Sequence, residues 1–365
     1  MKLKMKREEF ISILSDYTSI LRENSIKPIL STLFMEVKGN DLVFMGSSVE
    51  MDYKKQILCE GMEDGSVVFK PALVLEYVKL LEEEWITVEK LDGFLKIANG
   101  EFSIWEEENY PKIVELASMS LLELSGNEFA KCLETVKFSA AQTSENLALH
   151  CIRIVFGKEK VYFVSTDSYR LLYLEKKMTA QFERAISLPL DAVNVIIKLL
   201  KDKTEKISLE LSGDNLLFLW EGTYFSCRLT AVPYPNFQGI LSQNAFDKKM
   251  EFCLDDLKAA MKRVITVAKT SIDAKYGGTF DFKGKHLVVK AVTTGRAKTQ
   301  QKIVMMKEGE DFVASLNCKY LSEFLDSVSR NVIIEGKNSS SMFRVTEEGN
   351  EELIYILMPL ALREV

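Results

Sequence analysis

Two histidines and six cysteines are the side chains of this chain best suited to catalysis or metal binding. His150 and His286 lie far apart, and the cysteines are scattered without a C-x-x-C pair. Cys151 directly follows His150, which is too close for the two to share a metal ion, and no second ligand pair is present. We therefore expect structural histidines, reduced and mostly buried thiols of a cytoplasmic protein, and no metal or cofactor.

Carboxylates are plentiful, but they gather in runs rather than in catalytic patterns. The runs Glu82–Glu84 and Glu106–Glu108 are typical of solvated surface. The sequence contains no phosphate-binding loop, no G-x-G-x-x-G, no G-x-S-x-G and no H-E-x-x-H. We therefore expect the chain to have no catalytic activity of its own.

Basic side chains are the remaining candidates, because they attract phosphate groups. The formal net charge of −6 argues against indiscriminate coating of nucleic acid, although a total hides how charge is distributed. No run of about 18 apolar residues indicates a transmembrane helix. The basic N-terminus lacks the apolar stretch of a signal peptide, so secretion is not expected.

The elements that position these side chains form a repeat. An apolar i, i+3, i+4, i+7 stripe, typical of an amphipathic helix, begins at Phe10, Phe129 and Leu257. A second stripe begins at the same spacings, and two stripes obeying one pair of offsets indicate internal repetition. The first stripe comprises Phe10, Ile13, Leu14 and Tyr17, then Phe129, Cys132, Leu133 and Val136, then Leu257, Ala260, Met261 and Val264. The second comprises Val74, Tyr77, Val78 and Leu81, then Val193, Ile196, Ile197 and Leu200, then Leu321, Phe324, Leu325 and Val328.

Strands are predicted between the helices at matching places. The β-branched and aromatic runs Leu42–Met45, Val161–Val164 and Leu287–Lys290 are edged by turn-forming residues. The pattern predicts an α+β fold of three tandem domains, 1–120, 121–246 and 247–365, with boundaries near 118–121 and 245–249. No Gly/Ser-rich or Pro-rich linker separates them, so rigid docking is expected.

Three segments resemble one known family. Val164–Leu171, with the sequence VSTDSYRL, is similar to the Thr-Asp-x-His-Arg-Leu signature of bacterial sliding clamps, the β subunit of DNA polymerase III. Tyr234–Leu241 resembles that family's Phe-Pro-Asp-Tyr segment, and Tyr355–Leu360 resembles its Met-Pro-Met-Arg-Leu ending. Lys27–Leu30 and Ser48–Met51 also fit the first domain of the family. The resemblance covers essentially the whole chain.

The resemblance implies three clamp domains, each with two helices packed on antiparallel sheets. It further implies a head-to-tail homodimer, a six-domain ring with helices lining the hole, that encircles double-stranded DNA without reading its sequence. Such a ring confers processivity on the DNA polymerase III catalytic subunit and needs no cofactor. The alternative is a repeat-built protein-interaction scaffold that does not encircle DNA.

The resemblance also implies three groups of site residues. A pocket for peptides of the polymerase, the clamp loader and other partners would comprise Leu149, Thr166, Ser168, Tyr169, Arg170, Leu171, Pro235, Ile240, Ile356, Met358, Pro359 and Leu360. Methionine and branched aliphatic side chains suit such adaptable recognition. The DNA-facing residues would be Asn24, Lys198, Lys201, Lys262 and Arg263. The dimer contact would join Phe102 and Ile104 to Thr266 and Val267 of a second copy.

The helix lysines also have an ordinary interpretation as solvated side chains, and the chain departs from the family in several places. Asn24 stands where the family often has arginine, Tyr169 replaces the usual histidine, and Thr266 is polar where the family is apolar. Ala361 stands near the family's terminal arginine. The departures at Tyr169 and Ala361 predict a changed pocket rim and changed partner preference.

Overall fold

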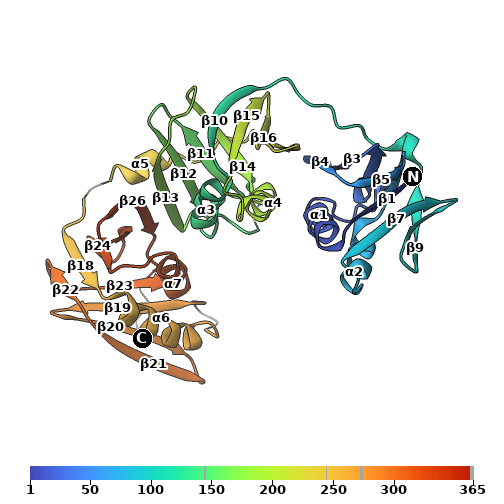
Figure 1. The fold of residues 1–365 in the computed structure, drawn as a ribbon. Helices are drawn as coiled ribbons and strands as arrows, with labels where there is room; N and C mark the ends of the chain where they lie inside the picture. The colour runs from blue at the N-terminus through green and yellow to red at the C-terminus, as the bar shows by residue number, and fades with distance from the viewer. Residues whose placement is uncertain (144, 244, 272–273, 362–365) are drawn as a thin grey trace. The chain divides into compact units, whose positions relative to one another are not determined.

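The structure is a computed structural model that describes residues 1–143, 145–243, 245–271 and 274–361. It divides into two compact units, which are described separately (Figure 1). Unit 1 comprises Met1–Lys131, Ala180–Phe182 and Asp191–Ala231. Unit 2 comprises Cys132–Thr179, Glu183–Leu190 and Val232–Val365.

One order of elements, strand, helix, three strands, strand, helix, three strands, occurs three times along the chain. The first copy contains β1 (Lys2–Lys6), α1 (Arg7–Ile20), β2 (Leu33–Lys38), β3 (Asp41–Ser47), β4 (Met51–Leu58), β6 (Gly65–Phe69), α2 (Pro71–Lys79), β7 (Trp85–Leu91), β8 (Phe94–Ile97) and β9 (Gly100–Trp105). The second contains β10 (Met119–Ser125), α3 (Gly126–Lys137), β11 (Cys151–Phe156), β12 (Lys160–Thr166), β13 (Arg170–Lys177), β14 (Arg184–Pro189), α4 (Leu190–Leu200), β15 (Lys206–Ser212), β16 (Asn215–Trp220) and β17 (Thr223–Arg228). The third contains β18 (Lys248–Phe252), α6 (Leu254–Ala268), β19 (Gly277–Lys283), β20 (His286–Thr293), β21 (Ala297–Val304), β23 (Phe312–Asn317), α7 (Cys318–Asp326), β24 (Val332–Gly336), β25 (Phe343–Glu347) and β26 (Asn350–Leu357). Short additions are η1 (Pro28–Ser31), β5 (Glu60–Glu63), η2 (Glu107–Asn109), α5 (Phe237–Leu241) and β22 (Met306–Glu308). The fold is therefore α+β and contains three copies of one order of elements.

The predicted helical stripes are the buried faces of the helices. All four stripe residues of α1, α3, α4 and α6 are buried, and those of α2 and α7 are buried apart from half-buried Tyr77 and Leu81. Leu81 and Val328 lie just beyond their helices, because α2 ends at Lys79 and α7 at Asp326. The side chain of Asn317 caps α7 by accepting hydrogen bonds from two backbone amides of its first turn.

Antiparallel ladders join the copies of the repeat into continuous sheets. In unit 1 the sheet order is β10-β15-β16-β17-β4-β3-β2-β6-β9-β8-β7-β1-β5, with β17 paired to β4. In unit 2 the order β14-β11-β12-β13-β26-β25-β24-β18-β22 includes the pairing of β13 with β26, and a second sheet runs β21-β20-β19-β23. Each junction therefore pairs the last strand of one copy with the fourth strand of the copy before it.

Two strands of the same kind lack this partner within the described chain. β9 is the last strand of the first copy, and its ladder with β6 covers only Trp105 and Ile104. β21 is the fourth strand of the third copy and forms one end of its sheet, paired with β20 alone. The Gly100–Ser103 part of β9, which is unpaired on the side away from β8, and the edge of β21 are equivalent to the strands that meet at the two internal junctions.

Large aromatic side chains fill the core of unit 1 behind α1. The Tyr17 hydroxyl donates to the backbone oxygen of Phe44 at 2.8 Å, and the Tyr17 and Tyr53 ring centroids lie 4.7 Å apart. Gly46 passes close to this cluster, since a Cβ added there would lie 2.6 Å from Cδ1 of Tyr17. In the described residues, no helix combines the length and apolar character needed to cross a membrane.

Candidate partner-binding surface

The turn between β12 and β13 carries four of the predicted pocket residues in unit 2. The Asp167 carboxylate accepts hydrogen bonds from the backbone amides of Tyr169 and Arg170 at 3.0 and 3.1 Å. Ser168 adopts a left-handed φ of 76°, which is uncommon outside glycine, and its amide donates to Thr166 Oγ1. The turn buries Thr166 and leaves Ser168 and Tyr169 exposed.

Arg170 is buried beneath this turn and is held from several sides. Its Nε donates to Asp167 at 3.0 Å, Nη1 donates to Glu323 of α7, and Nη2 donates to the Phe138 backbone oxygen at 2.7 Å. The guanidinium carbon lies 4.0 Å from the ring centroid of Tyr320. Arg170 therefore connects the β12–β13 turn to α7, with its hydrogen-bonding nitrogens engaged inside the protein.

An apolar cluster of unit 2 lies beside the turn. It brings together three predicted pocket residues, Leu171, Ile240 and Ile356, of which Leu171 and Ile356 are buried and Ile240 is half-buried. Sequence reasoning did not assign the other members, which are Val164, Tyr173, Tyr234, Phe237, Leu241, Phe246, Met342 and Ile354. Four of these lie inside the family-like segments quoted above, so the segments themselves were a signal, whereas Met342 and Phe246 had none.

The end of the chain passes over this surface. The Met358 amide donates to the Tyr169 backbone oxygen at 2.9 Å, which extends the β13–β26 pairing. The Leu360 amide donates to the Ser315 backbone oxygen at 2.7 Å, and its side chain packs near Gly277. Tyr169 and Met358 are 62% and 41% exposed, so they present the most accessible large apolar area here. Pro359 is half-buried, and residues 362–365 lie outside the described residues.

Two predicted pocket residues lie outside the apolar cluster. The Leu149 backbone oxygen accepts from Ala141, and the neighbouring His150 places Nδ1 2.9 Å from the Ala141 backbone oxygen. The Pro235 backbone oxygen accepts from the Phe237 amide at the start of α5. Both residues are half-buried and shape the loops on either side of the cluster.

Two of the five predicted DNA-facing side chains make contacts inside unit 1. Lys198 Nζ donates to the backbone oxygen of Ser15 in α1 and lies 3.1 Å from its hydroxyl. Burial lowers the pKa of Lys198, with Lys79 and Lys201 acting in the same direction and Asp16 opposing them. The Asn24 side-chain oxygen accepts from two amides of its own loop. These side chains organise unit 1 as folded.

The other three are exposed. Lys201 follows the end of α4, while Lys262 and Arg263 lie on the solvent face of α6, where Arg263 reaches Gln301 of β21 at 3.3 Å. The α1 helix differs from this pattern, because its solvent face carries Glu8 and Glu9. The solvent face of α6 is therefore more basic than that of α1.

Two of the four predicted dimer residues lie on β9, and the other two lie near the C-terminal end of α6. Phe102 of β9 is half-buried against Tyr77 of α2, with ring centroids 5.3 Å apart, and Ile104 is also half-buried. Thr266 is exposed near the end of α6 and donates to the Lys262 backbone oxygen at 3.0 Å. Val267 is half-buried, and its backbone oxygen accepts from Thr293 of β20.

The cysteines behave in the structure as separate thiols. Among the described residues no cluster of His, Cys, Asp and Glu has the geometry to hold a metal ion. Burial raises the pKa of Cys151 to about 11 and that of Cys318 to about 12, whereas Cys253 is exposed. Cys253 departs from the expectation of mostly buried thiols, because it stands at the N-cap of α6, where the chain turns out of β18.

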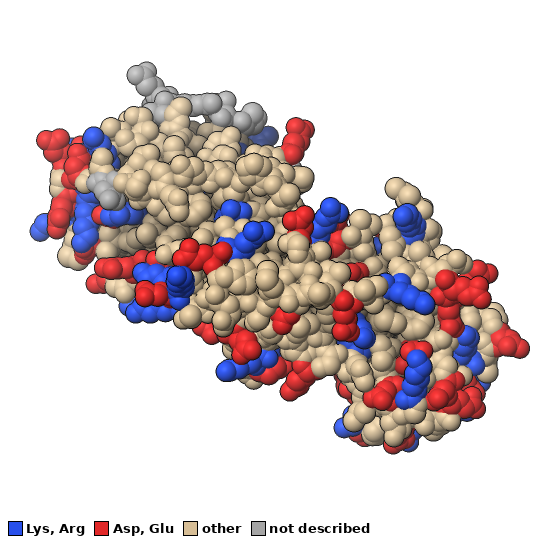
Figure 2. Space-filling model, turned by 90° about the horizontal axis from the view of Figure 1, so that it is seen from above, with Lys and Arg blue, Asp and Glu red and all other residues tan. Residues whose placement is uncertain are grey.

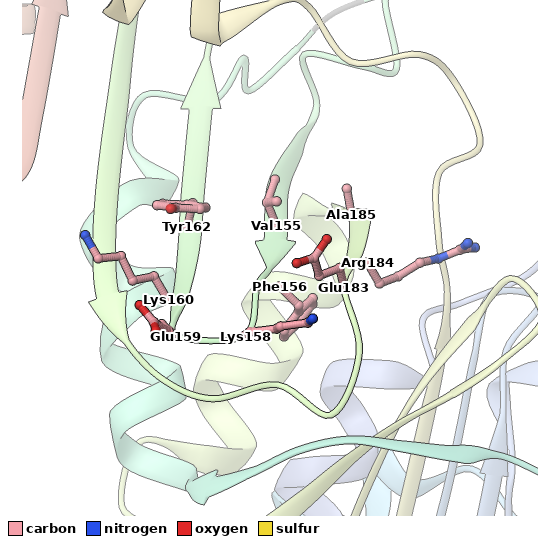
Figure 3. Close-up of a pocket in the computed structure, with 10 residues that line it drawn as sticks. Val155, Phe156, Lys158, Glu159, Lys160, Tyr162, Glu183, Arg184 and Ala185 are labelled. Carbon is pink, nitrogen blue, oxygen red and sulfur yellow. The ribbon is translucent and has the colours of Figure 1, made fainter.

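An open cavity of about 800 Å³ lies at another edge of unit 2 (Figure 3). Its labelled side chains come from the end of β11, the turn between β11 and β12, the start of β12, and the segment that enters β14. They include the basic residues Lys158 and Arg184 and the acidic residues Glu159 and Glu183. It contains none of the predicted pocket residues. A lining with both signs of charge does not select a ligand by its charge.

Comparison with known proteins places these features in context. Residues 1–113 match the profile described as the DNA polymerase III beta subunit, N-terminal domain, and residues 123–236 match that of its central domain. The chain is 20% identical to the beta sliding clamp of Haemophilus influenzae and 22% identical to that of Staphylococcus epidermidis, covering at least 99% of each chain.

Solved structures show the same fold. The DNA polymerase III beta subunit of Thermotoga maritima matches with a TM-score of 0.92 at 19% identity, covering 99% of this chain and 100% of that one. A sliding clamp of Pseudomonas aeruginosa bound to griselimycin matches with a TM-score of 0.91 at 18% identity over the same shares.

Proposed function

The chain belongs to the family of DNA polymerase III β subunits, the bacterial sliding clamps, and we propose on that basis that it encircles duplex DNA and tethers a replicative polymerase. It supplies no catalysis itself and acts by topology. We propose that its three domains are 1–120, 121–246 and 247–365, each corresponding to one copy of the repeated order of elements. The observation that carries the proposal is the pair of open strand edges left by the repeat.

Two copies close the ring by repeating the internal junction. β4 pairs with β17 through Met51–Lys55 and Thr223–Cys227, and β13 pairs with β26 through Arg170–Leu174 and Leu353–Leu357. The same rule applied to the open edges pairs β9 of one copy with β21 of a second. Because each copy has one edge of each kind, two copies use all four edges in a head-to-tail ring.

The register of this contact follows from the hairpins that carry the strands. Ile97 and Gly100 close the β8–β9 hairpin as Trp220 and Thr223 close β16–β17. Thr223 pairs with Lys55, and Lys55 is equivalent to Gln301 when the Asp41–Leu58 pair is matched to the His286–Val304 pair. Gly100 then lies opposite Gln301 of the second copy and Phe102 opposite Thr299, while Ile104 keeps its pairing with Phe69 of β6. Phe102 and Ile104 then lie on the α6 side of the sheet, the side of Thr266 and Val267.

The apolar cluster beside the β12–β13 turn is the proposed docking site for a short peptide bearing Leu and Phe. Tyr169 and Met358 expose the apolar area, and Leu171 and Ile356 form the floor. Burying one Leu and one Phe contributes roughly 3–6 kcal/mol before ordering costs, so a single peptide should bind at about micromolar Kd. Polymerase, clamp-loader and other peptides compete for this site.

DNA is held weakly and without sequence readout. Lys201, Lys262 and Arg263 are the exposed helix cations proposed to contact phosphate, and contacts to phosphate alone allow sliding. Lys198 and Asn24, which are engaged inside unit 1, contribute through their helices and loop. Two or three phosphate contacts per chain give a shallow salt dependence of DNA retention.

The test is retention on DNA of different topology. After loading onto nicked circular DNA, the protein should stay bound through gel filtration and should leave when a restriction enzyme linearises the circle. Retention on linear DNA with free ends, or equal loss from both forms, would contradict encirclement. Tyr169→Ala with Met358→Ala should abolish peptide binding and, because clamp-loader peptides use the same site, should also prevent loading, while the dimer in solution stays intact; this separates docking from ring closure.

A further inference from the structure

The two open strand edges carry opposite charge. Residues 82–108, which surround β9, contain nine acidic residues and two basic ones; the acidic residues are Glu82, Glu83, Glu84, Glu89, Asp92, Glu101, Glu106, Glu107 and Glu108. Residues 257–306, which surround β21, contain eleven basic and two acidic residues; the basic residues are Lys258, Lys262, Arg263, Lys269, Lys275, Lys283, Lys285, Lys290, Arg296, Lys298 and Lys302. The segment 82–108 therefore has a formal net charge of −7 and the segment 257–306 one of +9, in a chain whose net charge is −6.

Seven of the nine acidic side chains are exposed, whereas Glu89 and Glu107 are half-buried and pair with Lys2 and Lys90. Glu101 and Glu106 are exposed, and Lys96 lies opposite Glu101 on β8. Glu82–Glu84 follow the end of α2, which lies against β9 because a Cβ on Gly100 would lie 2.8 Å from Cζ of Tyr77. Figure 2 shows acidic and basic side chains interspersed over the end of unit 1 at the right of the view.

The basic side chains of β21 are exposed on one face of the strand. Arg296, Lys298 and Lys302 are exposed, and Lys290 on β20 lies opposite Gln300 on the same face. Thr299 and Gln301 point to the other face, where Gln301 meets Arg263 of α6. No ion pair is described for Arg296, Lys298 or Lys302 within the described residues, so their charge is available to a second molecule.

Docking one edge on the other brings the charges together. In the register that the internal junctions define, Glu101 lies opposite Gln300, with Lys298 and Lys302 at the two diagonal positions on the same face. Diagonal neighbours on paired strands lie about 7–8 Å apart at their backbones, within reach of long side chains. Glu106 lies one position past Arg296 in the same register.

From these charges we propose that the contact between copies has a fixed electrostatic polarity, an acidic β9 edge against a basic β21 edge, so that assembly is salt-sensitive and selective for a second copy of this chain. The proposal rests on the head-to-tail ring of the proposed function and names what selects the partner. Like edges repel, which disfavours head-to-head pairing. Thr266 is polar, so it contributes less apolar burial to the contact than an apolar side chain would. The attraction between the two charged edges offsets this loss.

The experiment uses two charge-reversed full-length chains. One carries Lys298→Glu and Lys302→Glu, so that both of its edges are acidic, and the other carries Glu101→Lys and Glu106→Lys, so that both are basic. Sedimentation velocity should show each alone as a monomer at concentrations where the unaltered chain is a dimer. An equimolar mixture should form a 1:1 dimer, because both contacts then join opposite charges.

Salt and a matched control complete the test. The dimer Kd of the unaltered chain should rise roughly tenfold or more between 0.05 and 0.5 M NaCl, since screening weakens exposed charge pairs. Lys158→Glu with Lys337→Glu makes the same change in net charge at exposed sites away from β21 and should leave the dimer intact. Circular dichroism checks that every variant is folded.

The outcomes separate this inference from the ring itself. Charge-reversed chains that dimerise as well as the unaltered chain, or a mixture that stays monomeric, would overturn the electrostatic selection. If the unaltered chain is still retained on nicked circular DNA in that case, the proposed function stands. An unaltered chain that is monomeric at every salt concentration and is not retained would overturn both.

Discussion

Replacing Arg170 with alanine should destabilise unit 2 more than any surface change. The substitution removes three hydrogen bonds at once and leaves the Asp167 and Glu323 carboxylates without the guanidinium that donates to both. Arg170 is 7% exposed, and the Asp167 side chain is 12% exposed. Removing one partner of a buried ion pair costs about 3–5 kcal/mol, because the remaining charge stays desolvated.

The stability lost on replacing Arg170 should depend on whether Glu323 keeps its charge. Glu323→Gln alone removes one charge while keeping an acceptor, and its effect should be smaller. In the double variant Arg170→Ala/Glu323→Gln one stranded charge is gone, so the double variant should lose less stability than the sum of the single losses. Arg170→Lys keeps the charge but cannot reach Asp167, Glu323 and the Phe138 backbone oxygen together, which predicts an intermediate loss.

Urea unfolding followed by circular dichroism measures these differences, and a peptide titration follows docking in the same samples. Arg170 joins the β12–β13 turn to α7. Peptide affinity should therefore fall most in the variant that loses most stability, because the turn carries Ser168 and Tyr169 of the docking site. A loss of unfolding free energy below about 1 kcal/mol for Arg170→Ala, or strict additivity with Glu323→Gln, would refute the conclusion that buried Arg170 stabilises the contact between the β12–β13 turn and α7.

Three further results are expected. Cys253 should be the fastest thiol to react with Ellman's reagent in the native protein, since it is exposed and burial raises the pKa of Cys151, Cys227 and Cys318; rapid reaction of four or more thiols would contradict the structure. Burial opposes the Glu347 charge, but hydrogen bonds from Asn350, Ser329 and Arg330 outweigh it and lower the pKa of Glu347. A lowered carboxyl pKa stabilises the fold above the ordinary value of 4.5 and is lost as pH falls through the folded value, so Glu347→Gln should reduce stability at pH 7 and flatten the acid limb of a pH–stability curve. Gly46→Ala should cost about 1–3 kcal/mol in urea unfolding, because its Cβ would overlap the fully buried Tyr17 ring; an unchanged midpoint would show that the ring can move.

The regular parts of the fold were predictable because burial imposes a period on the sequence. The α1 and α6 stripes, from Phe10 to Tyr17 and from Leu257 to Val264, appear as buried helix faces. The strand junctions were beyond reach of the same reasoning. Which edge pairs with which depends on contacts between segments far apart in the chain, such as β13 with β26, and periodicity within each strand carries no information about its partner.

In the candidate site too, the residues in patterned segments were predictable and those in loops were not. Leu171, Ile240 and Ile356 came together as the family resemblance implied, because each lies in a segment with a recognisable pattern. Met342 and Phe246 were missed, since an apolar side chain in a loop has no period to mark it. The predicted roles in peptide docking, DNA contact and dimerisation stay predictions, which the variants above test.

The charged residues require a different kind of reasoning, because their type does not say whether their partner is internal or external. Arg170 and Lys198 were both predicted to face a ligand, and both instead donate hydrogen bonds within the protein. Arg296, Lys298 and Lys302 carry no sequence pattern that predicts a ligand, and they are exposed without an ion pair in the described residues. A basic side chain with satisfied internal partners has little to gain from a phosphate or a carboxylate outside. Intermolecular contacts should therefore be sought among the exposed charges of α6 and β21, and variants at Lys198 should affect stability more than DNA retention.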